Sequence, residues 1–161
     1  MQGLLLKHSI AVQRRALHQS RSCLAEKVAT FDVQSVAKSF ELSPAVLSQA
    51  LTHKSFKHGK VPSNERLQYV GRRSLEYFTV EANINAKATD LQNKVRQTLD
   101  TQQLATKFDS LGLESGVQCH LPTNTISPAI KSKTVEALVG AVYHEKGLNA
   151  AKEFVKKHQL I

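Results

Sequence analysis

The apolar residues of this chain recur every three or four positions along most of its length, which is the spacing of one face of an α-helix. The sequence has no convincing stretch of alternating apolar and polar residues of the kind that indicates a strand. The pattern predicts an all-α fold with about seven helices around a single core. These helices are expected at about residues 31–40, 44–53, 64–82, 91–99, 104–112, 128–147 and 149–158.

Residues that favour helix ends support several of these boundaries. Ser43-Pro44 combines a capping side chain with a proline suited to the first helical position, and Ser63 or Asn64 can cap the third helix. Gly147 is expected to end the sixth helix, because glycine accepts the backbone conformation found just after a helix. Within that helix Gly140 is small enough to permit the close approach of another helix.

The composition is basic. The chain carries 22 Lys and Arg against 13 Asp and Glu, a net charge of +9, which favours an anionic partner such as RNA or a membrane surface. No apolar run reaches the roughly 18 residues typical of a transmembrane helix, so we expect no membrane-spanning segment. Cys23 and Cys119 do not form a C-x-x-C pair, which argues against a zinc site or a disulfide framework and predicts two free thiols.

The first 25 residues differ from the rest of the chain. They contain Lys7, Arg14, Arg15 and Arg21, no acidic residue, several serines and scattered apolar side chains. An arginine-rich, acid-free, amphipathic start is typical of a mitochondrial transit peptide, so residues 1–25 are predicted to be one. The alternative is a disordered basic arm that contacts RNA. We expect the folded domain at residues 31–158.

Four segments resemble the motifs of the RNase III domain, in order and roughly in spacing. They are residues 50–56 (ALTHKSF), 64–75 (NERLQYVGRRSL), 131–140 (KSKTVEALVG) and 141–151 (AVYHEKGLNAA). The resemblance covers about residues 31–158. It implies an all-helical domain that dimerises through the helix beginning near Asn64 and that, in its catalytic members, binds divalent cations through four acidic side chains.

The resemblance places these four acidic positions at Gln68, Arg72, Lys133 and Glu136, so one carboxylate remains and two positions are basic. A divalent cation would be repelled by two positive charges at this spacing, by several kcal/mol at an effective dielectric constant near 20. We therefore predict no bound metal, no cofactor and no enzymatic activity. Arg72 and Lys133 are expected either to pair with Glu136 or to contact RNA phosphate.

Other residues are candidates for contacts. The loop after His53 carries several lysines and can bind phosphate or be ordinary solvated surface. The RNA-binding candidates are Lys54, Lys57, Lys60, Arg73, Lys156 and Lys157. Because the family dimerises through the third helix, part of its apolar stripe is expected at an interface, and the remainder in the core. The interface candidates are Tyr69, Leu75 and Phe78.

The basic charge, the predicted mitochondrial address and the missing carboxylates resemble, within this family, the RNase III-like proteins of the fungal mitochondrial large ribosomal subunit. This implies a non-catalytic, structural ribosomal protein that binds ribosomal RNA, a second RNase III-like protein as heterodimer partner, and other large-subunit proteins, without contact to a membrane. We expect no double-stranded-RNA-binding domain after Ile161. The alternative is a non-catalytic or weakly active subunit of a mitochondrial double-stranded RNA endonuclease.

Overall fold

The computed structural model describes residues 31–120 and 125–161. The predicted transit peptide at residues 1–25 lies outside these ranges. The described chain contains six α-helices and two short 3-10 helices, and its only strand-like pairing is a single bridge between Thr52 and Gln118, so the predicted all-α fold is confirmed. The helices are α1 (Val33–Phe40), α2 (Pro44–Ala50), η1 (Phe56–Gly59), α3 (Glu65–Ala82), α4 (Ala88–Thr98), α5 (Thr101–Leu111), η2 (Glu114–Gly116) and α6 (Pro128–Lys157).

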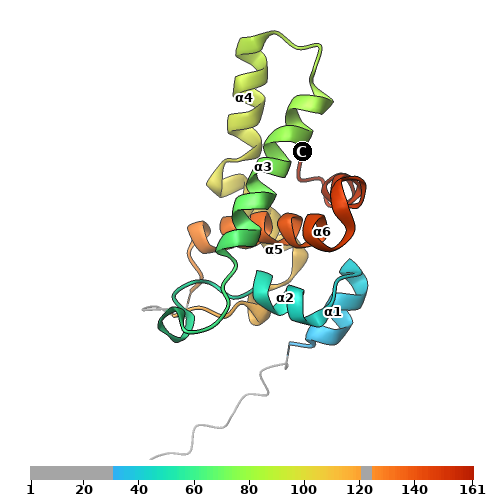
Figure 1. Ribbon diagram of the computed structural model, residues 1–161. Coiled ribbons are helices and arrows are strands. Elements are labelled where there is room, and N and C mark those ends of the chain that lie inside the picture. Colours follow the sequence, from blue (N-terminus) through green and yellow to red (C-terminus); the bar gives the residue numbers. More distant parts are fainter. Residues whose placement is uncertain (1–30, 121–124) are drawn as a thin grey trace, which may run out of the picture.

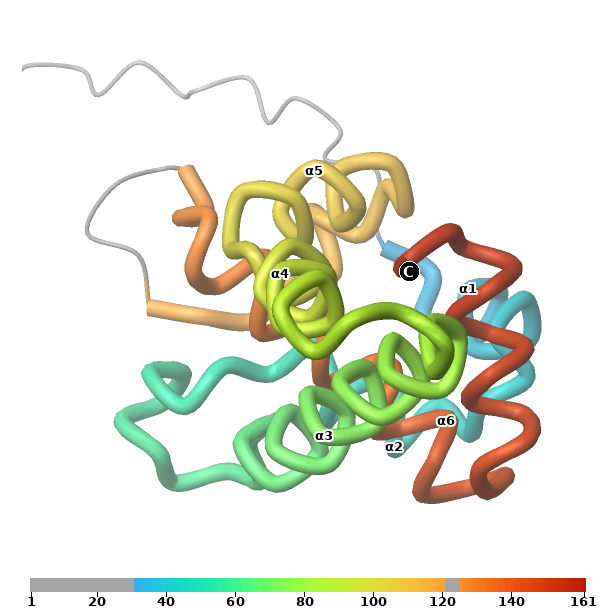
Figure 2. The backbone as a smooth tube through the Cα atoms, turned by 90° about the horizontal axis from the view of Figure 1, so that it is seen from above, coloured from blue at the N-terminus to red at the C-terminus, as the bar shows by residue number. Residues whose placement is uncertain are grey.

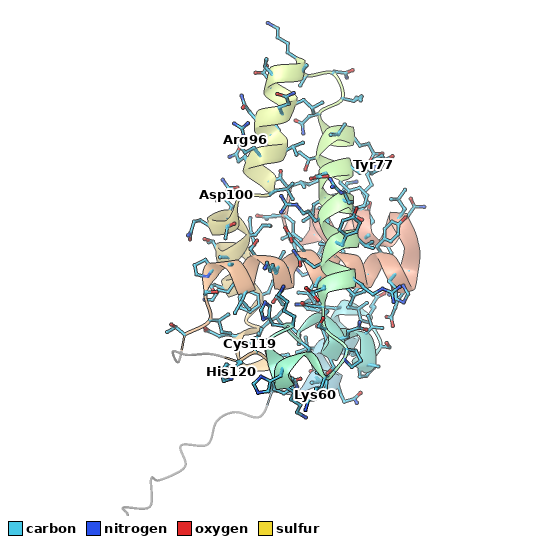
Figure 3. The ribbon with its side chains drawn as sticks, turned by 60° about the vertical axis from the view of Figure 1, so that its left-hand side comes forward. Lys60, Tyr77, Arg96, Asp100, Cys119 and His120 are labelled. Atoms are coloured by element: carbon cyan, nitrogen blue, oxygen red, sulfur yellow. The ribbon has the colours of Figure 1, made fainter. Side chains whose placement is uncertain are left out.

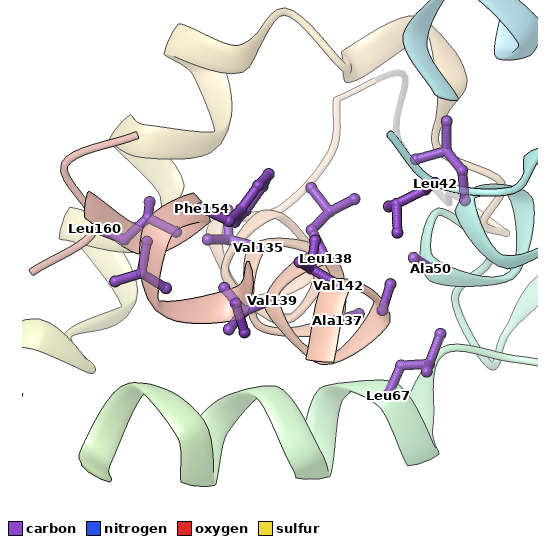
Figure 4. Packing of buried hydrophobic residues seen from close by; sticks show 14 of the residues in the cluster. Leu42, Ala50, Leu67, Val135, Ala137, Leu138, Val139, Val142, Phe154 and Leu160 are labelled. Atoms are coloured by element: carbon purple, nitrogen blue, oxygen red, sulfur yellow. The ribbon is translucent and has the colours of Figure 1, made fainter. Parts of the chain in front are cut away.

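The first part of α6 is the centre of the fold. It is buried almost all round, with Val135, Leu138 and Val139 fully enclosed, as expected of a helix that other helices surround. α3 packs along one side of it and α5 along another, and α2 also contacts it. Figure 1 shows α6 passing behind α3, and Figure 4 shows the apolar side chains gathered around α6.

Two glycines allow α3 and α6 to cross at close range. A Cβ atom at Gly71 would lie 1.7 Å from the Glu136 carbonyl oxygen, and one at Gly140 would lie 1.9 Å from the Leu67 carbonyl oxygen. Neither position can therefore hold a side chain without separating the helices. The predicted close approach at Gly140 is confirmed, and Gly71 is the matching residue on α3.

α3 and α4 form a hairpin that projects from the body of the protein (Figure 1). Seen from above, α4 lies over α5 and next to the second half of α3 (Figure 2). No residue of α4 is fully buried, and its apolar residues Leu91, Val95 and Leu99 are half-buried. The hairpin is thus held by one partly covered apolar face and not by a core of its own.

The helix ends agree with the sequence in part. The Ser43 hydroxyl accepts a hydrogen bond from the Val46 amide at 3.3 Å, as predicted. Asn64, one of the two predicted candidates, occupies the N-cap position of α3, but its side chain makes no capping hydrogen bond and donates instead to the Ala50 carbonyl at 3.2 Å, which ties α3 to the end of α2. Gly147, with φ of 81°, breaks α6 into the two helices that were predicted there.

None of the helices in the described ranges is both long enough and apolar enough to cross a bilayer.

Candidate functional site

A buried carboxylate lies where α3 crosses α6. The Glu136 side chain is 2% exposed, and donors from α3 reach both of its oxygens. Gln68 Nε2 lies 2.9 Å from Oε2, and Arg72 Nη1 lies 2.9 Å from Oε1. Because a buried carboxylate is stable only when it is paired and hydrogen-bonded, these two donors account for its burial. The structure therefore brings together three of the four residues singled out in the sequence.

The local geometry follows from the helices. Gln68 and Arg72 are one turn apart, so both project from the same face of α3. Gly71 lies between them and lets the backbone of α6 come close at Glu136. The Arg72 side chain is 46% exposed, so its guanidinium binds the carboxylate on one side and faces solvent on the other. The pair thus presents a cation, and not an anion, at the surface.

Lys133 is the fourth residue of the set and lies one turn before Glu136, half-buried on α6. The predicted pairing of Lys133 with Glu136 is not found, since no acidic side chain in the described ranges lies within ion-pair distance of it. Burial lowers the pKa of His53, and the positive charges of Lys133 and Lys54 lower it further. Lys54 itself pairs with Glu65 at 3.3 Å. The crossing is therefore electropositive.

These residues do not fit a divalent metal ion. Magnesium prefers several hard oxygen ligands in octahedral geometry, whereas Glu136 is the only carboxylate of the set and its oxygens are engaged by Arg72 and Gln68. Elsewhere in the described chain no three His, Cys, Asp or Glu side chains gather in an arrangement that could hold a metal. Arg72 and Lys133 are both cationic hydrogen-bond donors, which is the chemistry that an oxyanion requires and a metal ion does not.

The basic loop at residues 54–60 lies beside this crossing and is joined to the segment that ends at His120. The His120 amide donates to the Ser55 hydroxyl at 3.0 Å, and Figure 3 shows Lys60 and His120 at the same end of the protein. Lys57 adopts a left-handed backbone with φ of 45°, which few side chains favour. The exposed ammonium groups of Lys57 and Lys60 extend the positive surface away from α3.

The other predicted RNA-binding residues lie apart from this loop. Arg73 pairs with Glu76 at 2.5 Å on the outer face of α3. Lys156 pairs with Glu153 at 3.3 Å, and exposed Lys157 follows it at the end of α6. That end lies near the chain terminus, away from the loop (Figure 1). The six candidates therefore do not form a single patch, and their contact with RNA stays a prediction.

The interface candidates separate into two kinds. Leu75 and Phe78 are 0% and 1% exposed and belong to the core between α3 and α6, so they offer no surface to a second chain. Their selection as interface residues is thus corrected, since the apolar stripe they share is covered by α6. Tyr69 is 66% exposed and stays a candidate.

Sequence reasoning missed three neighbours of Tyr69. Tyr77, Tyr143 and Leu148 are 51%, 38% and 43% exposed, and all line one shallow apolar hollow of about 450 Å³ together with Tyr69. The signal available in the sequence was the spacing of positions 69 and 77, which lie two turns apart on one face of α3. We call Tyr69, Tyr77, Tyr143 and Leu148 the tyrosine face.

Cys119 is a free thiol, as predicted, and burial raises its pKa. Cys23 lies outside the described residues. His53 forms a packing and hydrogen-bonding contact, its Nδ1 atom lying 2.9 Å from the Ser55 hydroxyl.

Comparison with known proteins identifies the family. A family profile described as Ribonuclease-III-like matches residues 43–161, and the chain therefore belongs to this family. The chain is 27% identical over 120 residues to Ribonuclease 3 of Sinorhizobium fredii, covering 70% of this chain and 50% of the relative. It is 32% identical over 128 residues to Ribonuclease 3 of Thermobifida fusca, covering 73% and 53%. It thus spans about half the length of these curated relatives.

A solved structure supports the fold. The nuclease domain of ribonuclease III from Campylobacter jejuni superimposes with a TM-score of 0.69 at 25% identity, covering 79% of this chain and 95% of the other. That nuclease domain shows structural flexibility in a region involved in dimer formation. The fold expected from the four sequence motifs is therefore confirmed as that of an RNase III nuclease domain.

The prediction that the chain is not an enzyme is contradicted by these comparisons. The relatives carry the name Ribonuclease 3, and the solved structures are nuclease domains. The prediction rested on the charge of four side chains in one domain. A charge count of this kind does not include carboxylates that a second domain can supply at a shared site.

Proposed function

We propose that this chain binds double-stranded RNA as one half of a pair of RNase III-like domains. The observation that carries the proposal is the positive charge at the α3–α6 crossing, which carries the half-exposed Arg72 and, close to His53 at the start of the basic loop at residues 54–60, Lys133. Glu136, the only carboxylate among the four mapped positions, is neutralised by Arg72. Family membership supports RNA as the anion, because the relatives are ribonucleases.

The physical basis is attraction between lysine or arginine and the phosphate backbone. Each such contact releases a condensed counterion, so binding weakens as salt increases and does not depend on base sequence. Arg72 is suited to this role because its planar guanidinium can hold Glu136 with one edge and a phosphate with another. The exposed lysines of the loop add contacts without needing a shaped pocket.

The second domain of the pair is proposed to cover the tyrosine face. Single exposed apolar residues are normal on a monomer, but four large ones gathered in one hollow are typical of a surface that another molecule covers. Tyrosine is also common at interfaces, since it buries a large ring and keeps a hydroxyl for hydrogen bonding. Hydrolysis by such a pair would use cation-binding carboxylates of the second domain, because those of this chain do not fit a cation.

Fluorescence anisotropy with a labelled RNA duplex tests the binding. Lys57→Glu/Lys60→Glu is expected to weaken binding at least tenfold at moderate salt and to flatten its salt dependence. Lys38→Glu/Lys87→Glu is the matched control, because both lysines are exposed on other parts of the protein and the charge change is the same. Absence of duplex binding by the unaltered chain, alone and with a partner domain, would overturn the proposal.

A second candidate places the pair in the mitochondrial large ribosomal subunit, bound to ribosomal RNA, a second RNase III-like ribosomal protein and other large-subunit proteins. The acid-free, arginine-rich sequence of residues 1–25 favours a mitochondrial address. Sedimentation of a mitochondrial lysate tests this. The chain is expected with the large subunit, and its recovery only in light fractions, as an endonuclease subunit outside the ribosome would show, contradicts it.

A further inference from the structure

A second basic region lies at the far end of α3, away from the crossing. The ends of α3, α4 and α6 and the middle of α5 enclose a hollow of about 740 Å³. Lys94, Lys107 and Lys156 line it, each from a different helix. We call these three residues and their hollow the lysine hollow. Because α3 has 18 residues and rises about 1.5 Å per residue, the hollow lies some 27 Å from the start of that helix.

The charge of the lysine hollow is unbalanced. No aspartate or glutamate side chain is among its lining residues. Besides the lysines, the lining consists of asparagine, glutamine, threonine and apolar side chains. Lys94 and Lys107 have no ion pair to any acid in the described ranges, whereas Lys146 and Lys152 each have one and Lys131 has two. Lys156 contacts Glu153 at 3.3 Å in an exposed pair, which a stronger anion can replace at little cost.

A structural explanation accounts for only one of these lysines. Basic side chains are favoured in the last turn of a helix, where they offset the partial negative charge of the free carbonyl groups. Lys156 lies in the last turn of α6. In α4, however, the last-turn base is Arg96, and α5 has none, so Lys94 and Lys107 lie outside the turns where this effect operates.

The lining also suits a sugar–phosphate backbone. Gln97 and Gln103 supply side-chain amides that can both donate and accept hydrogen bonds, and Thr98 supplies a hydroxyl. Phosphate oxygens accept from ammonium and amide groups, and ribose hydroxyls can bond with either side of an amide.

We propose that the lysine hollow is a second contact site for the phosphate backbone of RNA, separate from the α3–α6 crossing and its loop. The proposal rests on the RNA-binding function proposed above and extends it to a surface formed by α3, α4, α5 and the end of α6. The two contact sites lie at opposite ends of α3, so one nucleotide cannot reach both of them. The ligand is therefore a duplex or structured RNA, and not a free nucleotide.

The test compares Lys94→Glu/Lys107→Glu with the control Lys38→Glu/Lys87→Glu in the full chain. Binding of a labelled duplex RNA is measured by anisotropy at several salt concentrations. The lysine-hollow variant is expected to bind at least tenfold more weakly at moderate salt. The slope of log affinity against log salt concentration is expected to become less negative by about two. The control is expected to change affinity less than threefold.

Two further measurements separate the outcomes. Lys94→Arg/Lys107→Arg is expected to keep binding, and thermal unfolding of every variant shows that the fold is retained; Lys94→Gln/Lys107→Gln replaces the glutamate variant if that one is unfolded. An effect equal to the control's, while Lys57→Glu/Lys60→Glu still weakens binding, overturns the lysine hollow alone. Failure of the unaltered chain to bind RNA overturns both this inference and the proposed function.

Discussion

The two ends of α3 meet the rest of the protein in opposite ways. In its first half, a glycine on each helix brings the α3 and α6 backbones into direct contact. In its second half, α3 turns into the α3–α4 hairpin, where α4 has no fully buried residue. The crossing tolerates no added atom, whereas the hairpin is held by a partly exposed face. The tightest packing of α3 therefore lies at the crossing, and its loosest packing lies at the hairpin.

The largest effect is expected at the crossing. Gly71→Ala places a methyl group within 1.7 Å of the Glu136 carbonyl oxygen, so the helices must separate, and the free energy of unfolding should fall by about 3 kcal/mol or more. Chemical denaturation measures this. Gly112→Ala is the control, because its φ is 66° but nothing lies within 4 Å, and it should cost only about 1 kcal/mol. Equal effects would show that the crossing can relax.

A smaller loss is expected from Arg72→Ala, which leaves the Glu136 carboxylate buried without its charge partner. Breaking a fully buried pair from one side costs about 3–5 kcal/mol, but the half-exposed Arg72 admits water, so about 2 kcal/mol is expected. Arg73→Ala removes the neighbouring exposed pair with Glu76 and should cost less than about 1 kcal/mol. Denaturation of both variants makes the comparison, and equal losses would contradict it.

The hairpin should respond weakly to truncation. Leu91→Ala removes a half-buried side chain of α4 and is expected to lower the free energy of unfolding by about 1 kcal/mol, because that side chain is already partly exposed to water. Leu104→Ala, in the fully buried face of α5, should cost about 2–5 kcal/mol. Hydrogen exchange sharpens the contrast, since amides of α4 should exchange faster than those of α5. Equal protection would contradict the difference between the regions.

The smallest effect concerns pH. Burial lowers the pKa of His53 and of His158 below the ordinary value of 6.5. The folded state therefore binds fewer protons than the unfolded chain, and the contribution of these residues is complete above pH 6.5 and is lost as pH falls through the lowered pKa values. Urea midpoints should thus decline from pH 7 to pH 5. His158→Phe should reduce the decline, and an equal decline in this variant would contradict the assignment.

Much of the fold was predictable because periodicity reports which face of a helix is apolar. The third helix was expected at residues 64–82 and occurs at Glu65–Ala82. Tyr69 and Phe78 lie nine residues apart, which places them on opposite faces of α3, so the spacing alone separates the exposed tyrosine from the buried phenylalanine. The missing cap at Asn64 was not predictable, because its tertiary acceptor at Ala50 has no local signature.

The site was predictable to a lesser degree. The residues at the crossing came from motif spacing, and the pairing of Arg72 with Glu136 is present. Lys133 pairs with no acidic side chain in the described ranges, and this was not predictable, because motif spacing does not show in which direction a side chain extends. The lysine hollow combines residues from α4, α5 and α6 with the end of α3, so only the assembled fold places them together.

The crossing of α3 and α6 also bears on how fast the chain reaches its native state. Gln68 and Glu136, which hydrogen-bond there, are 68 positions apart, and two helices lie between them. Closing so long a loop costs conformational entropy before any native contact compensates for it. The helices themselves can form locally within microseconds. We therefore expect the docking of α6 onto α3 to contribute strongly to the folding barrier, and Gly71→Ala to slow refolding as well as to lower stability.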